Sequence, residues 1–428
     1  MSVTPGPRRG GDALSALAPS VRGMRILHTS DWHLGRSFHR EGMLGHQAGF
    51  VDHLLEVVAA EQVDVVVVAG DVYDRALPPV DAVRLADETL TRLAASRARV
   101  VVSSGNHDSA RRLGFGARLV DAAGVHLRTD PDGVGTPVLL DDAHGPVAVH
   151  ALPYLDPHAV ADRWGLAERS HAAALTEAMD RVRTDLATRP GTRSVVLAHA
   201  FVAGGQPSDS ERDIGVGGVA RVPTSVFDGI DYVALGHLHG RQVLAEQVRY
   251  SGSPLAYSFS EAAHRKGSWL VDLGADGFER ATFVDAPVPR PLARLRGTLE
   301  TLLSDLTLSV HEDSWVEVTL TDATRPAGAM DLLRRRFPHT LLLGFESSRP
   351  TLDLLPAGDL HTRSDLDLAT EFVERLRGRR PAPAETALLG EALDACCDDR
   401  ELGRERAAEA ALVAAGAAAS PQRPGAAR

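Results

Sequence analysis

Five short clusters of aspartate, asparagine and histidine residues could supply ligands to metal ions. Each cluster follows an apolar run that is typical of a buried strand. The seven candidate donors are Asp31, His33, Asp71, Asn106, His199, His237 and His239. An extended backbone places residues i and i+2 on the same side, so Asp31 and His33 can face one point beyond their strand. A single Asp-x-His pair often only caps a strand, whereas five such clusters in succession favour one shared site.

The donor types indicate which metals would bind and what they would do. Carboxylate oxygens and imidazole nitrogens together suit Mn, Fe or Zn better than a thiolate site would. Seven donors are too many for one ion and fit two ions that share a bridging carboxylate. Two ions ~4 Å apart can clamp the attacking and leaving oxygens of a phosphoryl displacement. Two divalent ions would also outweigh the charge of the two carboxylates, and the resulting positive charge attracts a phosphodiester.

The elements that must position these clusters alternate between strands and helices. Strands are predicted at residues 24–27, 63–69, 99–103, 193–198 and 231–235, and helices at residues 41–61 and 80–95. The run from Val63 to Ala69 is rich in β-branched residues, which is typical of a strand buried on both faces. The alternation predicts an α/β fold, and β-rich stretches at 137–149 and 241–284 predict a second sheet.

From about residue 287 the sequence changes character. Alternating prolines form a linker-like stretch before a small α+β module, whose predicted elements are strands at 314–321 and 340–345 and a helix at 327–337. Two amphipathic helices are then predicted at 365–377 and 384–397. The expected segments are a disordered N-terminal extension (1–23), a main domain (24–286), a small domain (287–345), a linker with two helices (346–402) and a disordered Ala-rich tail (403–428).

The composition limits the class of protein. The chain carries 46 basic and 57 acidic residues and a formal charge of −11, so the whole molecule does not have the charge of a nucleic-acid binder. A local basic groove could still contact phosphates. Every basic residue except Lys266 is arginine. This skew is typical of GC-rich codon usage, so clusters of arginine carry less weight than usual.

Several features bear on the compartment. No stretch approaches the ~18 consecutive apolar residues of a membrane span. The two cysteines, Cys396 and Cys397, are adjacent and fit a reducing cytoplasm. The first 23 residues lack the apolar core of a signal peptide, and translation could start at Met24 as well as at Met1. We therefore expect a cytoplasmic protein that is not bound to a membrane.

The order Asp-x-His, Gly-Asp-x-x-Asp, Gly-Asn-His-Asp, His and Gly-His-x-His resembles the calcineurin-like metallophosphoesterase superfamily over about residues 24–285. The resemblance implies a β-sandwich flanked by helices that holds two metal ions. It assigns Asp31, His33, Asp71 and His239 to the first ion, and Asp71, Asn106, His199 and His237 to the second, with Asp71 bridging. His107 matches the catalytic histidine beside the leaving oxygen, and Asp108 would orient it.

Flanking residues narrow the resemblance to the bacterial SbcD family, the nuclease subunits of a DNA-repair complex. The similar stretches are 28–35, 106–115, 199–205, 208–212 and 250–254. Asp74 stands where archaeal and eukaryotic relatives usually place a second helper histidine. The resemblance implies a nucleoid-associated, Mn-dependent DNA exonuclease and endonuclease that hydrolyses phosphodiester bonds by a two-metal mechanism. Such a nuclease would act on DNA ends and hairpins in repair and recombination.

The resemblance also implies partners. Residues 287–345 would form a DNA-capping domain, and the helices at 365–397 would dock on the coiled coil of an SbcC-type ABC ATPase. A homodimer within a heterotetramer would form through helices at 79–96 and 109–122, where apolar stripes include Leu90 and Leu93. Part of each stripe must also cover its own sheet, and this ordinary packing could account for all of it.

Softer features leave alternatives open. The candidate DNA contacts are Arg36, Arg40, Arg111, Arg112, Arg241 and Arg265, although solvated loop charge explains them equally well. Trp32 could stack on a nucleotide or pack in the core. The chain could instead be a small-molecule or protein phosphoesterase, or a silent scaffold for the ATPase. The additional C-terminal segments argue against the first of these, and the complete ligand set argues against the second.

Overall fold

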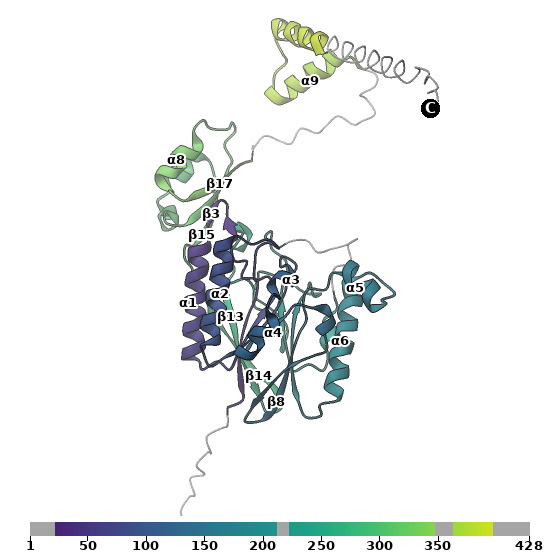
Figure 1. Ribbon diagram of the computed structural model, residues 1–428. Coiled ribbons are helices and arrows are strands. Elements are labelled where there is room, and N and C mark those ends of the chain that lie inside the picture. The colour runs from purple at the N-terminus through teal and green to yellow at the C-terminus, as the bar shows by residue number, and fades with distance from the viewer. Residues whose placement is uncertain (1–21, 212–221, 347–362, 397–428) are drawn as a thin grey trace, which may run out of the picture. The chain divides into compact units, whose positions relative to one another are not determined.

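The computed structural model describes residues 22–211, 222–346 and 363–396. The expected disordered extension, apart from residues 22 and 23, lies outside the described residues. The Ala-rich tail (403–428), Cys397 and most of the linker expected after residue 346 also lie outside them. The chain divides into two units, Met1–Glu346 and Ser347–Arg428, and each is described by itself (Figure 1).

The first unit is built around two six-stranded sheets. The first sheet has the order β14-β13-β1-β4-β5-β6, with β1 (Met24–Thr29), β4 (Val65–Ala69), β5 (Arg99–Ser103), β6 (Val125–Arg128), β13 (Gly267–Gly274) and β14 (Gly277–Asp285). The second has the order β11-β12-β10-β9-β8-β7, with β7 (Val138–Asp142), β8 (Gly145–Ala151), β9 (Arg193–His199), β10 (Tyr232–Gly236), β11 (Gln242–Ala245) and β12 (Val248–Tyr250). In the first sheet β1, β4, β5 and β6 run parallel, and β13 and β14 add antiparallel pairings on the other side of β1. In the second sheet β8, β9, β10 and β12 run parallel, and β7 and β11 pair antiparallel at its two edges.

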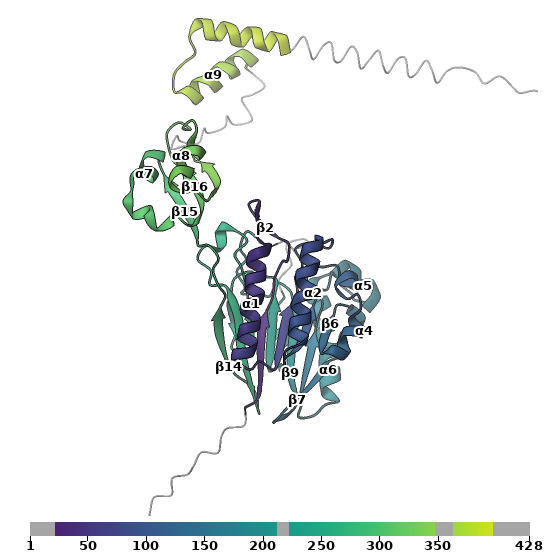
Figure 2. The ribbon, with the colours of Figure 1, turned by 60° about the vertical axis from the view of Figure 1, so that its left-hand side comes forward.

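The two sheets face each other, and helices cover their outer faces. On β4, Val65 and Val67 belong to the apolar layer between the sheets, while Val66 and Val68 pack beneath helices. This burial on both faces explains the uninterrupted β-branched run. Helices α1 (Leu44–Ala60) and α2 (Val80–Ala94) cover one face, and α5 (Pro157–Trp164) and α6 (His171–Ala187) cover the other (Figures 1 and 2). The predicted helix-flanked α/β sandwich is confirmed.

The central parallel strands of both sheets end at the same edge of the sandwich, and the polar clusters lie in the loops that follow. The backbone N–H of Asp31, after β1, donates to the Gly70 carbonyl after β4 at 3.1 Å. The two sheets approach closely here, because a Cβ atom on Gly236 would lie 1.8 Å from the Ala69 carbonyl oxygen. Only glycine permits this approach, and it brings loops from both sheets to one point.

The prediction of a single helix over residues 109–122 is wrong. The segment forms two short helices, α3 (Ala110–Leu113) and α4 (Ala117–Val120), followed by a 3-10 turn at Asp121–Ala123. Gly116 separates the two helices with a φ of +74°, in the left-handed region. α3 ends at its C-cap Gly114, and the left-handed Gly116 is the N-cap of α4, so the two helices do not continue into each other.

A three-stranded parallel sheet follows, formed by β15 (Leu292–Gly297), β16 (Trp315–Leu320) and β17 (Thr340–Phe345). Helices α7 (Leu299–Ser304) and α8 (Ala329–Arg336) pack on it around an apolar cluster of its own. Trp315 joins a second cluster with Phe38 and Phe259, next to the hairpin β2 (Ser37–Phe38) and β3 (Glu41–Gly42). Further 3-10 turns lie at Pro131–Gly133, Thr224–Phe227, Phe259–Glu261 and Leu306–His311.

In the second unit, α9 (Asp365–Arg377) begins after Ser364, whose side chain accepts a hydrogen bond from the backbone N–H of Asp367. A second helical stretch covers residues 383–396. No residue of α9 is buried, although its sequence is amphipathic. Across the described parts of both units, every helix is too short or too polar to cross a bilayer.

Candidate metal centre

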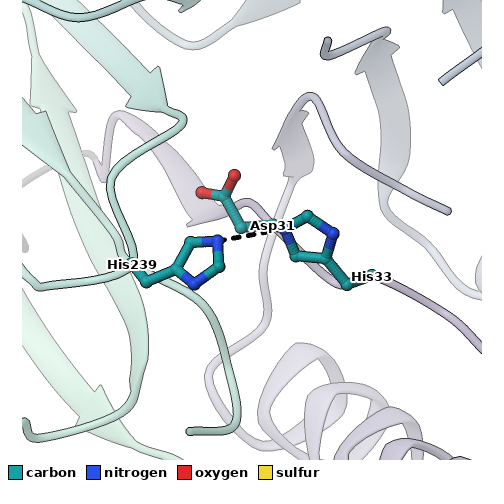
Figure 3. A group of neighbouring side chains, drawn as sticks. All are labelled: Asp31, His33 and His239. Carbon is teal, nitrogen blue, oxygen red and sulfur yellow. Dashed lines mark hydrogen bonds between the residues drawn. The ribbon is translucent and has the colours of Figure 1, made fainter. Parts of the chain in front are cut away.

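The first group of donors joins the loops after β1 and β10. Asp31, His33 and His239 each offer an atom, and these atoms lie within 4.8 Å of one another (Figure 3). The Nε2 atoms of His33 and His239 face each other at 3.0 Å. Asp31 and His33 have φ values of 53° and 47°, a region that side chains other than glycine rarely adopt. Packing holds this strained turn, and strain of this kind is concentrated at functional sites.

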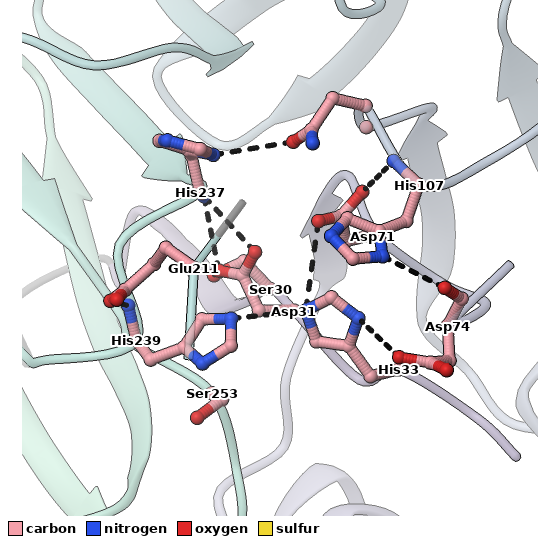
Figure 4. Close-up of polar contacts among 12 residues, drawn as sticks. Ser30, Asp31, His33, Asp71, Asp74, His107, Glu211, His237, His239 and Ser253 are labelled. Carbon is pink, nitrogen blue, oxygen red and sulfur yellow. Dashed lines mark hydrogen bonds and ion pairs between the residues drawn. The ribbon is translucent and has the colours of Figure 1, made fainter. Parts of the chain in front are cut away.

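Asp71 lies at the centre of the constellation (Figure 4). Its Oδ2 atom is 3.6 Å from the Nε2 atom of His33 and 3.4 Å from the Nε2 atom of His199. Its Oδ1 atom accepts the backbone N–H of His107 at 2.8 Å. Gly105 lies against the same carboxylate, and a Cβ atom there would be 2.1 Å from Oδ1. One carboxylate therefore faces histidines of both expected metal positions.

Asn106 completes the second group. Its Oδ1 atom lies 2.9 Å from the Nε2 atom of His199 and 3.2 Å from the Nδ1 atom of His237. The backbone N–H of His237 also donates to Asp31 at 3.1 Å, which ties the second group to the first. The structure thus brings all seven donors predicted from the sequence to one place.

The chemistry of these donors fits divalent cations. Six of the seven donors, all except Asn106, are buried. Two facing imidazole nitrogens can share only one proton, and lone pairs buried without a partner are costly. Within the described residues, donor groups of mixed carboxylate and imidazole type meet at this one edge of the sandwich. The residues therefore fit divalent metal ions.

Burial and neighbouring charges together shift the pKa values of the donors. Burial raises the pKa of Asp31 to about 6, against the lowering effect of His199. Burial also opposes the ionisation of Asp71, but His199 and His33 hold the pKa of Asp71 well below its usual range. Burial would lower the pKa of His199, yet the Asp71 and Asp31 carboxylates raise it to about 9. Because metal ligands must be deprotonated, protons and metal ions compete for these atoms.

His107 lies beside this cluster. Its ring contacts the ring of His33 edge to face, with the ring centroids 4.7 Å apart. Its Nδ1 atom lies 2.8 Å from the carbonyl oxygen of Asp74, whose carboxylate is 3.8 Å from the Nδ1 atom of His33. Asp74, the departure from the usual helper histidine, therefore contacts both histidines, one through its backbone and one through its side chain.

The contacts of the Asp108 carboxylate differ from those that the resemblance implied. Its carboxylate accepts the backbone N–H groups of Val72, Tyr73 and Gly105 at 2.9–3.1 Å. These bonds join the loop after β4 to the loop after β5. The partner that orients Nδ1 of His107 is thus the Asp74 carbonyl, and Asp108 organises the backbone on which the donors stand.

The expected DNA contacts differ in how accessible they are. Arg36 is turned inward, where it donates to the Ser210 carbonyl at 2.8 Å and lies over the Tyr257 ring. Arg112 donates to the Ala76 carbonyl, Arg265 pairs with Asp285, and Arg241 lies over the Phe283 ring; Arg40 and Arg111 are exposed. Trp32 is buried in the core and donates to the Thr29 hydroxyl at 3.0 Å, so it cannot stack on a nucleotide.

Sequence reasoning missed a group of residues behind His239. The backbone N–H of His239 donates to Glu211 at 2.7 Å, and its ring contacts Ser210. Ser210 contacts the buried Glu261, which pairs with Lys266. Burial would raise the pKa of Glu261, but the Lys266 ammonium holds it below its usual range. Two signals were present in the sequence: Lys266 is the only lysine, and Ser210 and Glu211 lie in the stretch 208–212 that resembles the SbcD family, although no role was assigned to them.

The comparisons with known proteins agree with this architecture. The family model of the calcineurin-like phosphoesterases matches residues 24–241. A second model, SbcD_C, described as the type 5 capsule protein repressor C-terminal domain, matches residues 288–376. The first match spans slightly more than half of the 428 residues.

Solved structures with similarity to the chain include three proteins of low sequence identity. A dimetal phosphatase from Danio rerio is 15% identical, with a TM-score of 0.40 and coverage of 62% of this chain and 100% of that one. GAP50, the anchor in the inner membrane complex of Plasmodium, is 13% identical, with a TM-score of 0.39 and coverage of 62% and 85%. TT1561 of Thermus thermophilus is 14% identical, with a TM-score of 0.36 and coverage of 62% and 99%. From the family match and the donor cluster together, the chain belongs to the calcineurin-like phosphoesterase family of metal-dependent hydrolases, with a C-terminal domain consistent with SbcD.

Proposed function

We propose that the protein is a Mn-dependent DNA nuclease that hydrolyses phosphodiester bonds with two metal ions. The observation that carries this proposal is the combination, in one chain, of the buried carboxylate–histidine centre with the SbcD-type C-terminal match at 288–376. A phosphatase acting on small substrates needs only the former. In this proposal residues 24–286 are the catalytic domain, 287–345 help to position DNA, and 346–402 bind a partner.

The described contacts support a division of the donors between two ions. Asp31, His33, Asp71 and His239 would hold the first ion, and Asp71, Asn106, His199 and His237 the second. When bound, the ions would act as Lewis acids that stabilise the negative charge developing on the phosphate. Asp71 faces histidines of both groups and so would bridge them.

His107 would act on a proton and not on a metal. A carbonyl oxygen only accepts hydrogen bonds, so the Nδ1 atom of His107 carries a proton that it donates to Asp74. Proton transfer by this ring would then take place at Nε2. A histidine at this position can assist the departing 3′-oxygen, which is the role of a general acid.

The proposal is tested by digestion of linear duplex, hairpin and single-stranded DNA with purified protein and Mn²⁺. We expect cleavage of single strands that ceases when EDTA is added and returns with excess Mn²⁺. The same preparation is assayed on p-nitrophenyl phosphate. Hydrolysis of that ester without cleavage of any DNA would favour a small-molecule phosphoesterase, and inactivity on all substrates would favour a scaffold.

We further propose that α9 and the helical stretch 383–396 dock on the coiled coil of an SbcC-type ATPase. Phe372 and Leu388 are 60% and 64% exposed, and α9 buries no residue within its own unit. An amphipathic helix whose apolar face is only partly covered is suited to binding in a groove. The charge of the helix is carried on the other face, where Arg375 pairs with Glu371.

Truncation at residue 356 is expected to leave a metal-binding nuclease that cleaves single strands but no longer co-purifies with the ATPase. Phe372→Asp with Leu376→Asp in the full-length chain should weaken the same association without removing any element. Co-expression followed by pull-down measures the association with the ATPase. Arg377→Ala, a substitution on the surface of the same helix, is the control. If the truncated chain is insoluble, the helices belong to the nuclease fold and not to a docking segment.

We also propose a symmetric dimer at the α2–α4 face, with a corrected set of residues. Leu93 is buried in the core and Leu90 packs against it, so these two leucines cover their own sheet. Phe115 and Leu119 are instead 88% and 82% exposed, and Val80 on α2 is 67% exposed. A two-fold contact is self-complementary, so one exposed apolar patch can serve both subunits.

Light scattering at micromolar concentration is expected to give a dimer mass for the parent and a monomer mass for the Phe115→Asp, Leu119→Asp variant. Both substitutions place charge on exposed positions, so the fold should survive. Leu306→Asp, at an equally exposed leucine in another part of the unit, is the matched control and should remain dimeric. A monomeric parent would defeat the proposal.

A further inference from the structure

Lys266 is the only lysine among 46 basic residues, and it is buried. Its ammonium group has three acceptors: the carbonyl oxygen of His239 at 2.8 Å, the Ser253 hydroxyl at 2.9 Å and the Glu261 carboxylate. Three donors of an ammonium therefore meet three acceptors. A guanidinium is planar and carries five N–H donors, so arginine in this pocket would leave buried donors without partners.

Glu261 connects this ammonium to the ring of His239. One of its oxygens accepts from Lys266, and the other contacts the Ser210 hydroxyl. The Ser210 Oγ atom is in turn 2.5 Å from the Nδ1 atom of His239. Lys266 therefore reaches His239 twice, directly at its backbone carbonyl and through Glu261 and Ser210 at its ring.

The order of donors along this chain follows from what each group can supply. A carboxylate paired with an ammonium only accepts, so the single hydroxyl proton of Ser210 goes to Glu261. The Ser210 oxygen then accepts from His239, which places the ring proton on Nδ1. The Nε2 atom is left with its lone pair, and this is the atom that faces Nε2 of His33 at 3.0 Å.

We infer that Lys266, Glu261 and Ser210 form a positioning relay that fixes the tautomer and the ring orientation of His239 for metal binding. The inference rests on the proposed two-metal function and adds residues to which neither the motifs nor the family match assigns a role. The relay joins three separate segments, since Ser210 follows β9, His239 follows β10, and Glu261 and Lys266 precede β13. Partners of this kind hold a ligand ready, and their loss typically weakens metal affinity about 10- to 100-fold.

The test is a Mn²⁺ titration of the full-length chain. Calorimetry measures the affinity for each ion, and electron paramagnetic resonance detects whether the two ions form a spin-coupled pair. The parent should bind two ions and show the signal of a spin-coupled pair. Ser210→Ala and Lys266→Arg should retain one ion at parental affinity, bind the other about 10- to 100-fold more weakly, and show an uncoupled signal at low Mn²⁺. Ser210→Thr keeps the hydroxyl and should restore the coupled signal. Arg265→Lys, next to Lys266 but exposed and paired with Asp285, is the control.

The outcomes separate this inference from the proposed function. A parent that binds no Mn²⁺ contradicts the proposed function itself. A parent with two ions and variants with unchanged affinities overturns the relay alone, as does an equal loss of both ions. Should Lys266→Arg fail to fold, Ser210→Ala decides the matter, because it removes a single hydroxyl group.

An independent measurement concerns the burial of Lys266. In the folded chain an amine-reactive acylating reagent should leave Lys266 unmodified and should acylate it only on unfolding, and the α-amino group, the other amine of the chain, is followed in the same digest. Peptide mapping by mass spectrometry distinguishes the two positions. Rapid acylation of Lys266 in the native protein, without loss of Mn²⁺ affinity, would show that the ammonium does not serve His239.

Discussion

His107→Ala is expected to keep both metal ions while losing about 10²- to 10⁴-fold in nuclease activity, the usual contribution of a general acid or base. The ring of His107 donates to the Asp74 carbonyl. Its backbone N–H, which alanine retains, donates to Asp71 at 2.8 Å. The substitution should therefore remove a proton-transfer group without releasing the carboxylate that faces both sets of histidines.

Elemental analysis gives the metal content of this variant, and cleavage of single-stranded DNA gives its rate. Asp121→Asn, which alters an ion pair with Arg128 on another part of the sandwich, is the control and should match the parent in both. The alternative is that His107 is itself a metal ligand. The structure allows this role, because donor atoms of His33, Asp74 and His107 also lie within 4.8 Å of one another. Loss of metal together with activity would make His107 a ligand.

Asp71→Asn is expected to weaken the binding of both ions by at least about 100-fold, the upper end of the effect of supporting residues. The substitution keeps the shape of the side chain but removes its charge. Its Oδ2 atom lies at 3.4–3.6 Å from nitrogens of both His33 and His199, so no other donor faces both groups as closely in the described contacts.

Calorimetric titration with Mn²⁺ measures the two affinities, and the rise in melting temperature on adding Mn²⁺ provides a second readout. Parental protein should gain stability with metal, since a ligand that binds only the folded state stabilises it. The variant should gain almost none at the same concentration. Asp121→Asn, the same exchange of side chain at an ion pair with Arg128 away from the donors, is the matched control and should retain both ions. Parental affinity for one ion in Asp71→Asn would show that Asp71 does not bridge.

Local sequence was sufficient for most of the strands and for the set of donors, but not for the sheet to which each strand belongs. β13 and β14 lie in the stretch 241–284 that was expected to form a second sheet, yet they belong to the first. The run Val65–Ala69 is apolar at every position because both faces of β4 are covered, and such a run is visible without a structure. The donors follow strand ends, where parallel strands of one sandwich must deliver their loops to one edge. Residue type and spacing along the chain encode these features, so the α/β sandwich and the convergence of the seven donors were predicted correctly.

Tertiary structure decided which group each side chain serves. Asp108 is adjacent to His107 in sequence, yet its carboxylate bonds to backbone N–H groups of the loop after β4. Arg36 follows the first cluster but turns inward to Ser210, which is 174 positions away. Residues that are adjacent in sequence lie in the same loop, but their side chains point in different directions. The direction of each side chain depends on packing against distant segments, which local sequence patterns do not identify.

The same reason separates the exposed from the buried apolar residues near α2. Leu93 and Phe115 both lie in helices that the sequence predicts for the dimer, but Leu93 is buried while Phe115 is exposed, because the helix expected over 109–122 ends at Leu113 and Phe115 stands between two short helices. The sequence shows that Lys266 is the only lysine, but it does not show what the lysine contacts. Its three hydrogen-bond acceptors come from positions 5 to 27 residues away. The sequence by itself determined which donors exist and at which edge they gather, whereas only the folded chain, by bringing distant segments into hydrogen-bond distance, decided what holds them in place.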